Sequence, residues 1–266
     1  MEPYSAVTSV QNSMVKHAHS LTVPKKLKES EDFLCEGYHL LREALESELK
    51  IRYVLSTESA SRREEGRELF ALAGRKKVRW VTAGEKILQY LSDQPSPQGL
   101  AAVVKKPEFQ WPHETTDLVL AVHGVQDPGN LGALLRTAEA AGAGGIVLAE
   151  GCCDPFNPKS VRAAMGSLFR LPVQSGVAWR DAQAQFKAGN LQTVALMPRG
   201  SVSLAELKPE RRVYWVGAEG EGLPQDLSEA CDLQARIEMK GRVESLNVSA
   251  SAAIALFYKG FRGPVS

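Results

Sequence analysis

The residues best suited to chemistry lie in three polar segments in the second half of the chain. The first segment, DPGNLGALLR, places Asn130 and Arg136 six residues apart, directly after an apolar run. Its Asp-Pro-Gly is typical of a turn, and Asn130 is a favourable N-cap for a helix that we expect to end before Gly142. Taken alone, this segment favours a capped helix with a solvated arginine over a functional site.

The second segment, VGAEGEGLP at residues 216–224, holds three glycines within six residues. Glycine permits positive φ and lets the backbone approach a ligand closely. The carboxylates of Glu219 and Glu221 would repel a phosphate group, so the segment favours a cationic or neutral ligand such as a sulfonium. Pro224 suits the first turn of a following helix. An ordinary strand-to-helix turn is the equally weighted alternative.

The third segment, residues 236–251, leads into an apolar helix that we expect over residues 252–258. Ser245 and Asn247 place a hydroxyl group and an amide at the mouth of this helix. The structural alternative makes one of them the N-cap of the helix. Small residues from 249 to 255 indicate close contact with neighbouring backbone, either in the core or at a subunit interface.

Short apolar runs precede these segments and predict the sheet that positions them. The runs cover residues 118–122, 145–149, 193–197 and 213–216, and helical patterns separate them. Continuous apolar strands that alternate with helices are typical of a parallel sheet covered on both faces. Ligands of such sheets bind beyond the carboxyl ends of the strands. The loops that follow the strands are therefore the expected site of chemistry.

The first half of the chain predicts a smaller α/β domain. Apolar residues follow Gly37 at helical spacing, a second helix is indicated over 62–73, and strands are indicated at 51–55, 78–81 and 99–104. Residues 1–106 carry 17 Lys and Arg against 14 Asp and Glu, whereas the remainder carries 15 against 17. Two prolines bracket the polar stretch between these parts. We expect domains at 1–106 and 117–266 joined by a linker at 107–116.

Composition narrows the classes of function. The 266 residues carry 32 Lys and Arg and 31 Asp and Glu, so any nucleic-acid partner must be held by local basic patches. No apolar run approaches the length of a membrane span, and the N-terminus lacks the apolar core of a secretion signal. The four cysteines form no CxxC pair, so we expect no metal site. A cytoplasmic location is predicted.

Together, the segments DPGNLGALLRTAEAAGA, VGAEGEGLP and SLNVSASAA resemble the three motifs of the SpoU/TrmH-like RNA ribose 2′-O-methyltransferases. The resemblance extends from about residue 117 to residue 261. It implies a SPOUT-type catalytic domain with a parallel sheet, a C-terminal trefoil knot, S-adenosylmethionine as cofactor and a homodimer formed next to the cofactor. The segment FLCEGYHLLREAL resembles the L30e-like substrate-binding domain of larger members.

The resemblance also implies roles for single residues. It gives the catalytic role to Arg136, which we expect to orient the ribose hydroxyl and the adjacent phosphate and to stabilise the developing oxyanion. A guanidinium keeps its proton in proteins, so a literal general-base role is disfavoured. Asn130, Glu219, Ser245 and Asn247 would hold Arg136 and the ribose in register. A purely structural ion pair between Glu219 and Arg136 is the alternative.

The implied cofactor requires an apolar slot for adenine and a close backbone approach. Glu238 stands where the family usually has proline, so this position departs from the family's pattern at the expected backbone contact to the cofactor. The residues expected to bind the cofactor are Leu196, Met197, Gly217, Ile237, Met239 and Leu246.

The implied substrate is structured RNA, with 23S rRNA favoured and tRNA as an alternative. Basic runs that suit phosphate contacts are Lys25, Lys26 and Lys28, the cluster Arg75, Lys76, Lys77 and Arg79, and the later Arg162 and Arg170. A non-catalytic RNA-binding ribosome-assembly factor is the alternative from another class, and the full set of motif residues argues against it. A dinucleotide-binding dehydrogenase is disfavoured because G-x-G-x-x-G is missing.

Overall fold

The computed structural model describes residues 6–109, 116–208, 210–241 and 243–260. The chain forms two compact units, one of residues 1–108 and 156–169 and the other of residues 109–155 and 170–266. Most of the expected linker at 107–116 lies outside the described residues. None of the helices in the described ranges has the length and hydropathy that a membrane span requires.

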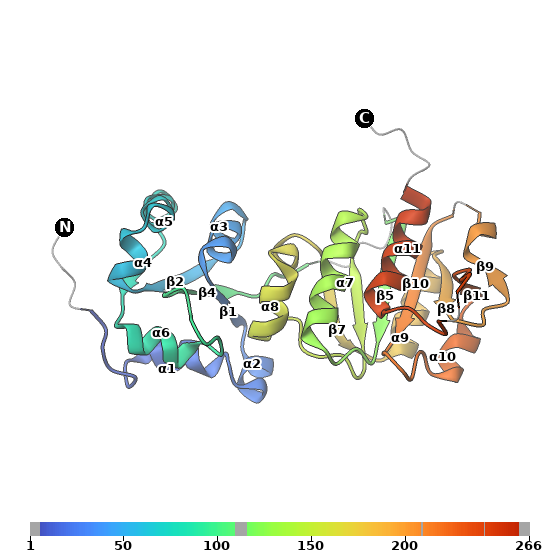
Figure 1. Cartoon of the computed structure of the whole chain (residues 1–266), viewed down its shortest axis with the longest axis horizontal. Coiled ribbons are helices and arrows are strands. Elements are labelled where there is room, and N and C mark those ends of the chain that lie inside the picture. Colours follow the sequence, from blue (N-terminus) through green and yellow to red (C-terminus); the bar gives the residue numbers. More distant parts are fainter. Residues whose placement is uncertain (1–5, 110–115, 209, 242, 261–266) are drawn as a thin grey trace. The chain divides into compact units, whose positions relative to one another are not determined.

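The first unit is built around a four-stranded sheet in the order β1-β4-β2-β3 (Figure 1). Strands β1 and β2 are antiparallel to β4, and β3 is parallel to β2. The elements of this unit are α1 (Ser13–Ser20), α2 (Pro24–Glu29), β1 (Asp32–Glu36), α3 (Tyr38–Glu46), β2 (Ile51–Ser56), α4 (Glu58–Arg62), α5 (Glu64–Arg75), β3 (Trp80–Thr82), α6 (Glu85–Leu91), β4 (Leu100–Lys105), α8 (Pro158–Ala164) and η1 (Ser167–Phe169).

Residues 156–169 pack within the first unit, although they follow the expected linker by about 40 residues in sequence. The ring of Phe33 on β1 lies 5.2 Å from that of Phe156 and 5.9 Å from that of Phe169. The guanidinium of Arg162 on α8 pairs at 3.1 Å with the carboxylate of Glu36, whose side chain is only 5% exposed. The ring contacts and the ion pair therefore hold residues 156–169, including α8, against β1.

The second unit contains a seven-stranded sheet in the order β7-β6-β5-β10-β8-β11-β9, with every paired strand parallel to its neighbour. The resemblance to SPOUT-type α/β proteins is thus confirmed in its sheet, whereas the trefoil knot stays a prediction. The elements are β5 (Leu118–His123), α7 (Pro128–Ala140), β6 (Ile146–Ala149), β7 (Val173–Val177), α9 (Trp179–Ala188), β8 (Gln192–Leu196), β9 (Val202–Ser203), η2 (Leu204–Glu206), β10 (Arg212–Gly217), α10 (Gln225–Ala230), β11 (Leu233–Arg236) and α11 (Val248–Gly260).

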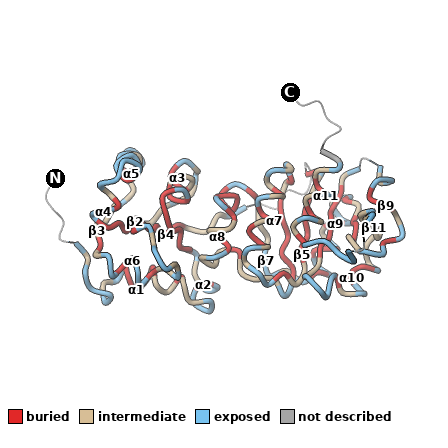
Figure 2. Tube along the Cα trace, in the orientation of Figure 1, coloured by how far each residue is buried: buried red, intermediate tan, exposed pale blue. Residues whose placement is uncertain are grey.

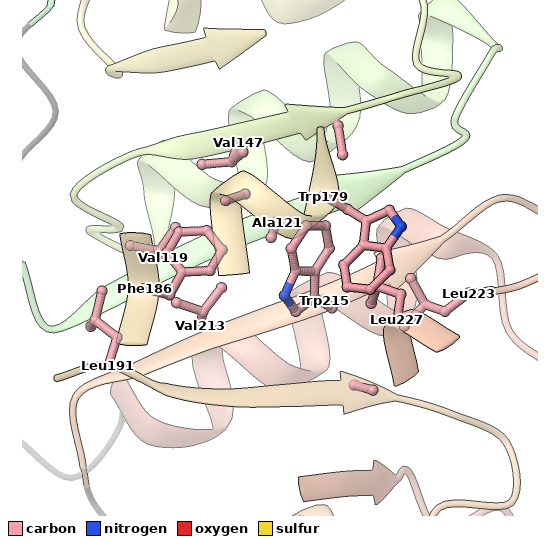
Figure 3. Packing of buried hydrophobic residues seen from close by; sticks show 13 residues of the cluster. Val119, Ala121, Val147, Trp179, Phe186, Leu191, Val213, Trp215, Leu223 and Leu227 are labelled. Carbon is pink, nitrogen blue, oxygen red and sulfur yellow. The ribbon is translucent and has the colours of Figure 1, made fainter. Parts of the chain in front are cut away.

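Both faces of the central strands are buried, as their continuous apolar runs predict (Figure 2). On one face, Val213 and Trp215 of β10 pack in a cluster with Trp179 and Phe186 of α9 and Leu227 of α10 (Figure 3). The ring of Phe186 meets that of Trp215 edge-on at 5.9 Å. On the other face, α11 packs beside α7 and against β10 and β5. The two layers of helices hold the sheet between them.

The structure confirms the expected strands at the sheet centre and corrects three helix starts, since α11 begins at Val248 and not at residue 252. Helix α7 begins at Pro128, and its N-cap is Asp127, whose carboxylate accepts a hydrogen bond from the amide N–H of Asn130. Asn130 is therefore inside the first turn, and its side chain is available for other contacts. Gly142 has φ +70°, as expected after the helix end. Pro224 is the N-cap of α10 and not part of its first turn.

Candidate functional site

The three polar segments meet at one edge of the parallel sheet. Strands β5 and β10 are neighbours, with His123 paired to Gly217 at their carboxyl ends, so the loops after them emerge side by side. Strands β8 and β11 continue the sheet beyond β10 and end at the same edge. The order of strands reverses between β5 and β10, which is where open α/β sheets form their binding crevices.

A cavity of about 340 Å³ lies at this edge. It is bounded by residues that follow β8, β10 and β11 and by the start of α11. All six residues that the sequence singled out for the cofactor line it: Leu196, Met197, Gly217, Ile237, Met239 and Leu246. The sequence analysis missed other lining residues that lie within two positions of these six, and proximity along the chain was the signal for them: Pro198, Val216, Ala218, Ala235 and Val248.

Position 217 lines this cavity and requires glycine for steric reasons. A Cβ atom at this position would lie 2.1 Å from the carbonyl carbon of Gly222 and 2.4 Å from the amide nitrogen of Leu223. The amide of Gly222 donates a hydrogen bond of 2.9 Å to the carbonyl of Ala218, which closes the turn. Only glycine leaves room for the chain to reverse direction this tightly. The glycine-rich segment is therefore a close-packed turn beside the cavity.

Three of the five residues assigned to catalysis form one hydrogen-bonded cluster. The amide nitrogen Nδ2 of Asn247 donates to Oδ1 of Asn130 at 3.1 Å and also to Oε1 of Glu219. The carbonyl oxygen Oδ1 of Asn247 accepts from the backbone N–H of Ser249 at 2.9 Å. Asn247 thus caps α11, as one alternative predicted, and at the same time joins the three segments. The Oγ of Ser249, a residue not singled out from the sequence, donates to the backbone carbonyl of Asn130 at 3.2 Å.

In the described ranges, the other two assigned residues form no side-chain hydrogen bond with this cluster. Ser245 lines the cavity and is exposed. Arg136 is exposed on α7, and in the described ranges its guanidinium has neither a hydrogen bond nor an ion pair. It therefore forms no structural ion pair with Glu219, the alternative considered from the sequence. Within one chain, the structure does not bring Arg136 to the cluster that was expected to hold it.

A second cavity of about 250 Å³ adjoins the first and shares Ala218, Glu219 and Val248 with it. Its remaining walls come from Glu221 of the glycine-rich segment and from the chain after β5, including Asp127 and Asn130. Glu219 therefore lies between two spaces, one lined mainly by apolar side chains and the other mainly by polar groups. A site for transfer between two ligands requires such a pair of adjoining spaces.

Two thiols of this unit have raised pKa values, and the described residues hold no cluster of potential metal ligands. Burial raises the pKa of the Cys152 thiol to about 11 and that of the Cys231 thiol to about 12. Both thiols stay protonated at neutral pH and are poor nucleophiles. No group of three His, Cys, Asp or Glu side chains with metal-binding geometry occurs among the described residues.

The basic residues that the sequence suggested for phosphate contacts divide into arginines that pair with carboxylates and residues exposed to solvent. Arg162 pairs with Glu36 and Asp93, and Arg170 pairs with Glu139, so these two arginines are already neutralised. The three lysines around α2 and the cluster after α5 are all exposed: Lys25, Lys26, Lys28, Arg75, Lys76, Lys77 and Arg79. In the third polar segment, residues 236–251, the carboxylate of Glu238 pairs with Arg236 at 2.8 Å. Arg242, in the same segment, lies outside the described residues.

Known families match both halves of the chain. The model of the SpoU rRNA methylase family matches residues 117–257, and that of the MRM3-like substrate binding domain matches residues 12–102. The chain is 33% identical over 258 residues to the 23S rRNA (guanosine(2553)-2′-O)-methyltransferase RlmP of Bacillus subtilis, covering 95% of this chain and 98% of that protein.

Solved structures agree over nearly the whole length. A crystal structure of an RNA 2′-O ribose methyltransferase superposes with a TM-score of 0.78 at 31% identity, covering 97% of this chain and 98% of that one. An AdoMet-bound rRNA methyltransferase from Sinorhizobium meliloti gives a TM-score of 0.83 at 31% identity, with 98% and 99% covered. These matches extend through both units and include the site at the sheet edge. The chain belongs to the SpoU rRNA methylase family.

Proposed function

We propose that the protein transfers a methyl group from S-adenosylmethionine to a ribose 2′-hydroxyl of ribosomal RNA, with 23S rRNA as substrate. The observation that carries this proposal is the apolar cavity at the edge of the sheet, with the Asn130–Asn247–Glu219 cluster at its mouth. Membership of the SpoU family and the similarity to RlmP support the same reaction.

The lining of the cavity suits the chemistry of S-adenosylmethionine. Its apolar walls, including Leu196, Ile237 and Met239, fit the adenine ring, while Gly217 lets the backbone run close to the ligand. The carboxylate of Glu219 at the mouth favours the positive charge of a sulfonium. When bound, this cofactor supplies an electrophilic methyl group on a sulfonium sulfur.

The residues of the chain then have to place the ribose hydroxyl in line with that methyl group. We infer that the second cavity admits the ribose, because it adjoins the first at Glu219. Asn130 and Glu219 offer an amide and a carboxylate there, and the Asn247 bridge holds both side chains in place. Arg136 would orient the hydroxyl and the neighbouring phosphate and stabilise negative charge on the oxygen.

A homodimer is part of this proposal, because Arg136 stands outside the cluster in a single chain. Helix α11 leaves Ile254 and Tyr258 38% and 43% exposed one turn apart, while Ala252, Ala255 and Leu256 are buried. An exposed apolar stripe on a helix that begins at the site is typical of a subunit interface. Association through α11 would place a second chain next to the cofactor cavity.

We further propose that residues 1–106 bind the RNA, residues 107–116 form a linker and residues 117–266 carry catalysis. The match of a substrate-binding family to residues 12–102 supports this division, as does the excess of basic residues in the first part. Packing of residues 156–169 in the first unit adds a segment of the catalytic half to it. The cytoplasm, where ribosomal RNA is modified, is the proposed location.

The test is transfer of tritium from labelled S-adenosylmethionine to protein-free 23S rRNA by the purified full chain. Resistance of one nucleotide to alkaline cleavage then identifies the 2′-O-methylated position. We expect incorporation into 23S rRNA and none when the rRNA is replaced by its methylated product. Incorporation into tRNA alone would establish the tRNA alternative. Tight binding of rRNA without any transfer would establish the non-catalytic assembly factor.

A further inference from the structure

One surface of the first unit carries a stack of two aromatic rings that is not part of its core. His19 in the last turn of α1 and Tyr90 in the last turn of α6 lie with ring centroids 4.2 Å apart and ring planes within 9° of parallel. Tyr90 is 46% exposed, and His19 is half-buried. The two helices pack against each other (Figure 1), and Tyr90 leaves nearly half of its surface open to solvent beside the stacked His19.

Two lysines flank the stack by helical spacing. Lys16 precedes His19 by three residues on α1, and Lys86 precedes Tyr90 by four on α6, so each lysine shares a helix face with one ring. Gln89 lies next to Tyr90. All three of these polar side chains are exposed, and in the described ranges none has a side-chain hydrogen bond or ion pair. We call Lys16, His19, Lys86, Gln89 and Tyr90 the α1–α6 platform.

The platform carries no carboxylate. Glu85 is the sole acidic residue in the sequences of α1 and α6, and its Oε1 is engaged by the hydroxyl of Ser59 on α4 at 2.7 Å. The surface is therefore positively charged around an exposed ring pair. Such a combination suits a ligand that has both flat apolar faces and negative charge.

Neither helix depends on the stack for its place in the fold. The buried side chains of Val15 and Ala18 hold α1 against the core. Those of Ile87, Leu88 and Leu91 do the same for α6. The neighbouring His17 is anchored inward instead, with Nδ1 3.2 Å from the hydroxyl of Tyr53 and Nε2 3.5 Å from Asp32.

Another exposed ring of this unit offers a contrast. Phe70 is 38% exposed but meets Trp80 edge-on at 90°, so that pair presents no parallel stack. The α1–α6 platform thus combines exposure, parallel stacking and flanking lysines in a way that the Phe70–Trp80 pair does not.

We propose that the α1–α6 platform binds an unpaired stretch of the RNA substrate, with one base stacked on Tyr90 and the adjacent phosphates held by Lys16 and Lys86. This inference rests on the proposed function, because it assigns the RNA of that reaction to one surface. Unpaired bases stack readily on tyrosine and histidine rings, whereas bases inside a duplex cannot reach them. Lysines contribute affinity that depends on salt but not on sequence.

The experiment measures binding of the full chain to a labelled single-stranded RNA of mixed sequence, about 12 nucleotides long to match the site sizes typical of single-strand binding, with a duplex of the same sequence as the comparison. We expect Tyr90→Ala to weaken single-strand binding by roughly tenfold or more, and Tyr90→Phe to stay within about twofold of the wild type. Phe70→Ala, which removes a ring of similar exposure, serves as the matched control and should bind normally. Thermal melting of each variant verifies the fold.

Photo-crosslinking gives a readout that needs no variant. A 4-thiouridine in the single strand should crosslink to a peptide that contains Tyr90 or His19. In the methylation assay, Tyr90→Ala should raise the KM for rRNA at least severalfold and leave kcat at saturating rRNA unchanged.

The platform would be refuted if the duplex binds as tightly as the single strand, if Tyr90→Ala binds like the wild type, or if the crosslinked peptides lie outside α1 and α6. Failure of the proposed function is a separate result. A wild-type protein that binds unpaired RNA through Tyr90 but transfers no methyl group would retain the platform and lose the reaction.

Discussion

Replacing Gly217 by alanine tests whether the glycine-rich turn shapes the cofactor cavity. The added Cβ atom would lie 2.1 Å from the carbonyl carbon and 2.2 Å from the oxygen of Gly222, and 2.4 Å from the nitrogen of Leu223. All three are backbone atoms, so no flexible side chain can turn away. Relief requires the turn to move by roughly 1.5 Å, since carbon atoms pack at roughly 3.5–4 Å.

The size of the effect follows from that displacement. Overpacking a rigid site costs about 1–3 kcal/mol, and a clash with backbone belongs at the upper end of this range. For a protein of this size, about 3 kcal/mol corresponds to a fall in Tm of roughly 6–12 °C. The displaced residues line the cavity, and a misplacement of about 1 Å is enough to cost on the order of 100-fold in a positioned site. We expect the Kd for S-adenosylmethionine to rise by about that factor.

Two other glycines supply controls for this measurement. At Gly241 an added Cβ meets no atom within 4 Å, so Gly241→Ala should leave both Tm and Kd unchanged. At Gly220 the space is also open but φ is +88°, so alanine adds about 1–2 kcal/mol of backbone strain without a clash. Calorimetric titration and thermal melting compare the three variants. If Gly217→Ala binds the cofactor and melts like Gly241→Ala, the close packing of this turn does not shape the site.

Three further experiments test the proposed catalytic role of Arg136, the proposed subunit interface and the raised pKa of the Cys152 thiol. Arg136→Ala and Arg136→Lys should both abolish methyl transfer and keep cofactor affinity within a few fold, since an ammonium lacks the planar fork of a guanidinium; near-normal turnover by either would remove Arg136 from the mechanism. If the chain forms the proposed dimer through α11, light scattering should give twice the 28.9 kDa chain mass for the wild type and a monomer for Ile254→Glu, and an active, dimeric variant would place the interface elsewhere. Burial raises the pKa of Cys152 from 9.0 to about 11, so its alkylation at pH 8 should be about 100-fold slower in the folded protein than in urea. Because the folded pKa is the higher one, this thiol contributes stability below pH 9 that is lost as the pH rises toward 11, and equal alkylation rates would contradict its burial.

The α1–α6 platform and the cavity proposed for the cofactor belong to different units. We therefore expect a variant in one to leave the binding function of the other intact. Loss of single-strand binding in Tyr90→Ala with normal cofactor titration would separate RNA affinity from methyl-donor binding. Loss of cofactor binding in Gly217→Ala with normal RNA binding would complete the separation. Together the two variants test whether recognition and chemistry reside in different parts of the chain.

The sequence alone was sufficient to predict the central strands of the parallel sheet and six residues that line one cavity at its edge. Central parallel strands are buried on both faces and therefore read as continuous apolar runs, so the strands around residues 118–122 and 213–216 were predictable. Loops that follow such strands must emerge at one edge, which is why motif residues such as Leu196 and Met239 line one cavity although they are far apart in the chain.

Other features depended on tertiary contacts that have no local signal. Strand β1 was not predicted, because Asp32 and Glu36 at its ends are buried through ion pairs with Arg52 and Arg162 from distant elements. The edge strands β7 and β9 and the neighbouring strand β11 are short or half-exposed and lack a clear apolar pattern.

Competition between two side chains for the N-cap of α7 determines which of them joins the polar cluster. Asp127 and Asn130 are both good N-caps, and only the backbone of α7 determines that Asp127 caps the helix. That choice leaves Asn130 available to Asn247, which bridges it to Glu219 from 117 residues further along the chain. The sequence thus determined which residues could carry the chemistry, and the tertiary structure decided which of them meet, because hydrogen bonds between distant segments form only after the sheet has aligned its loops.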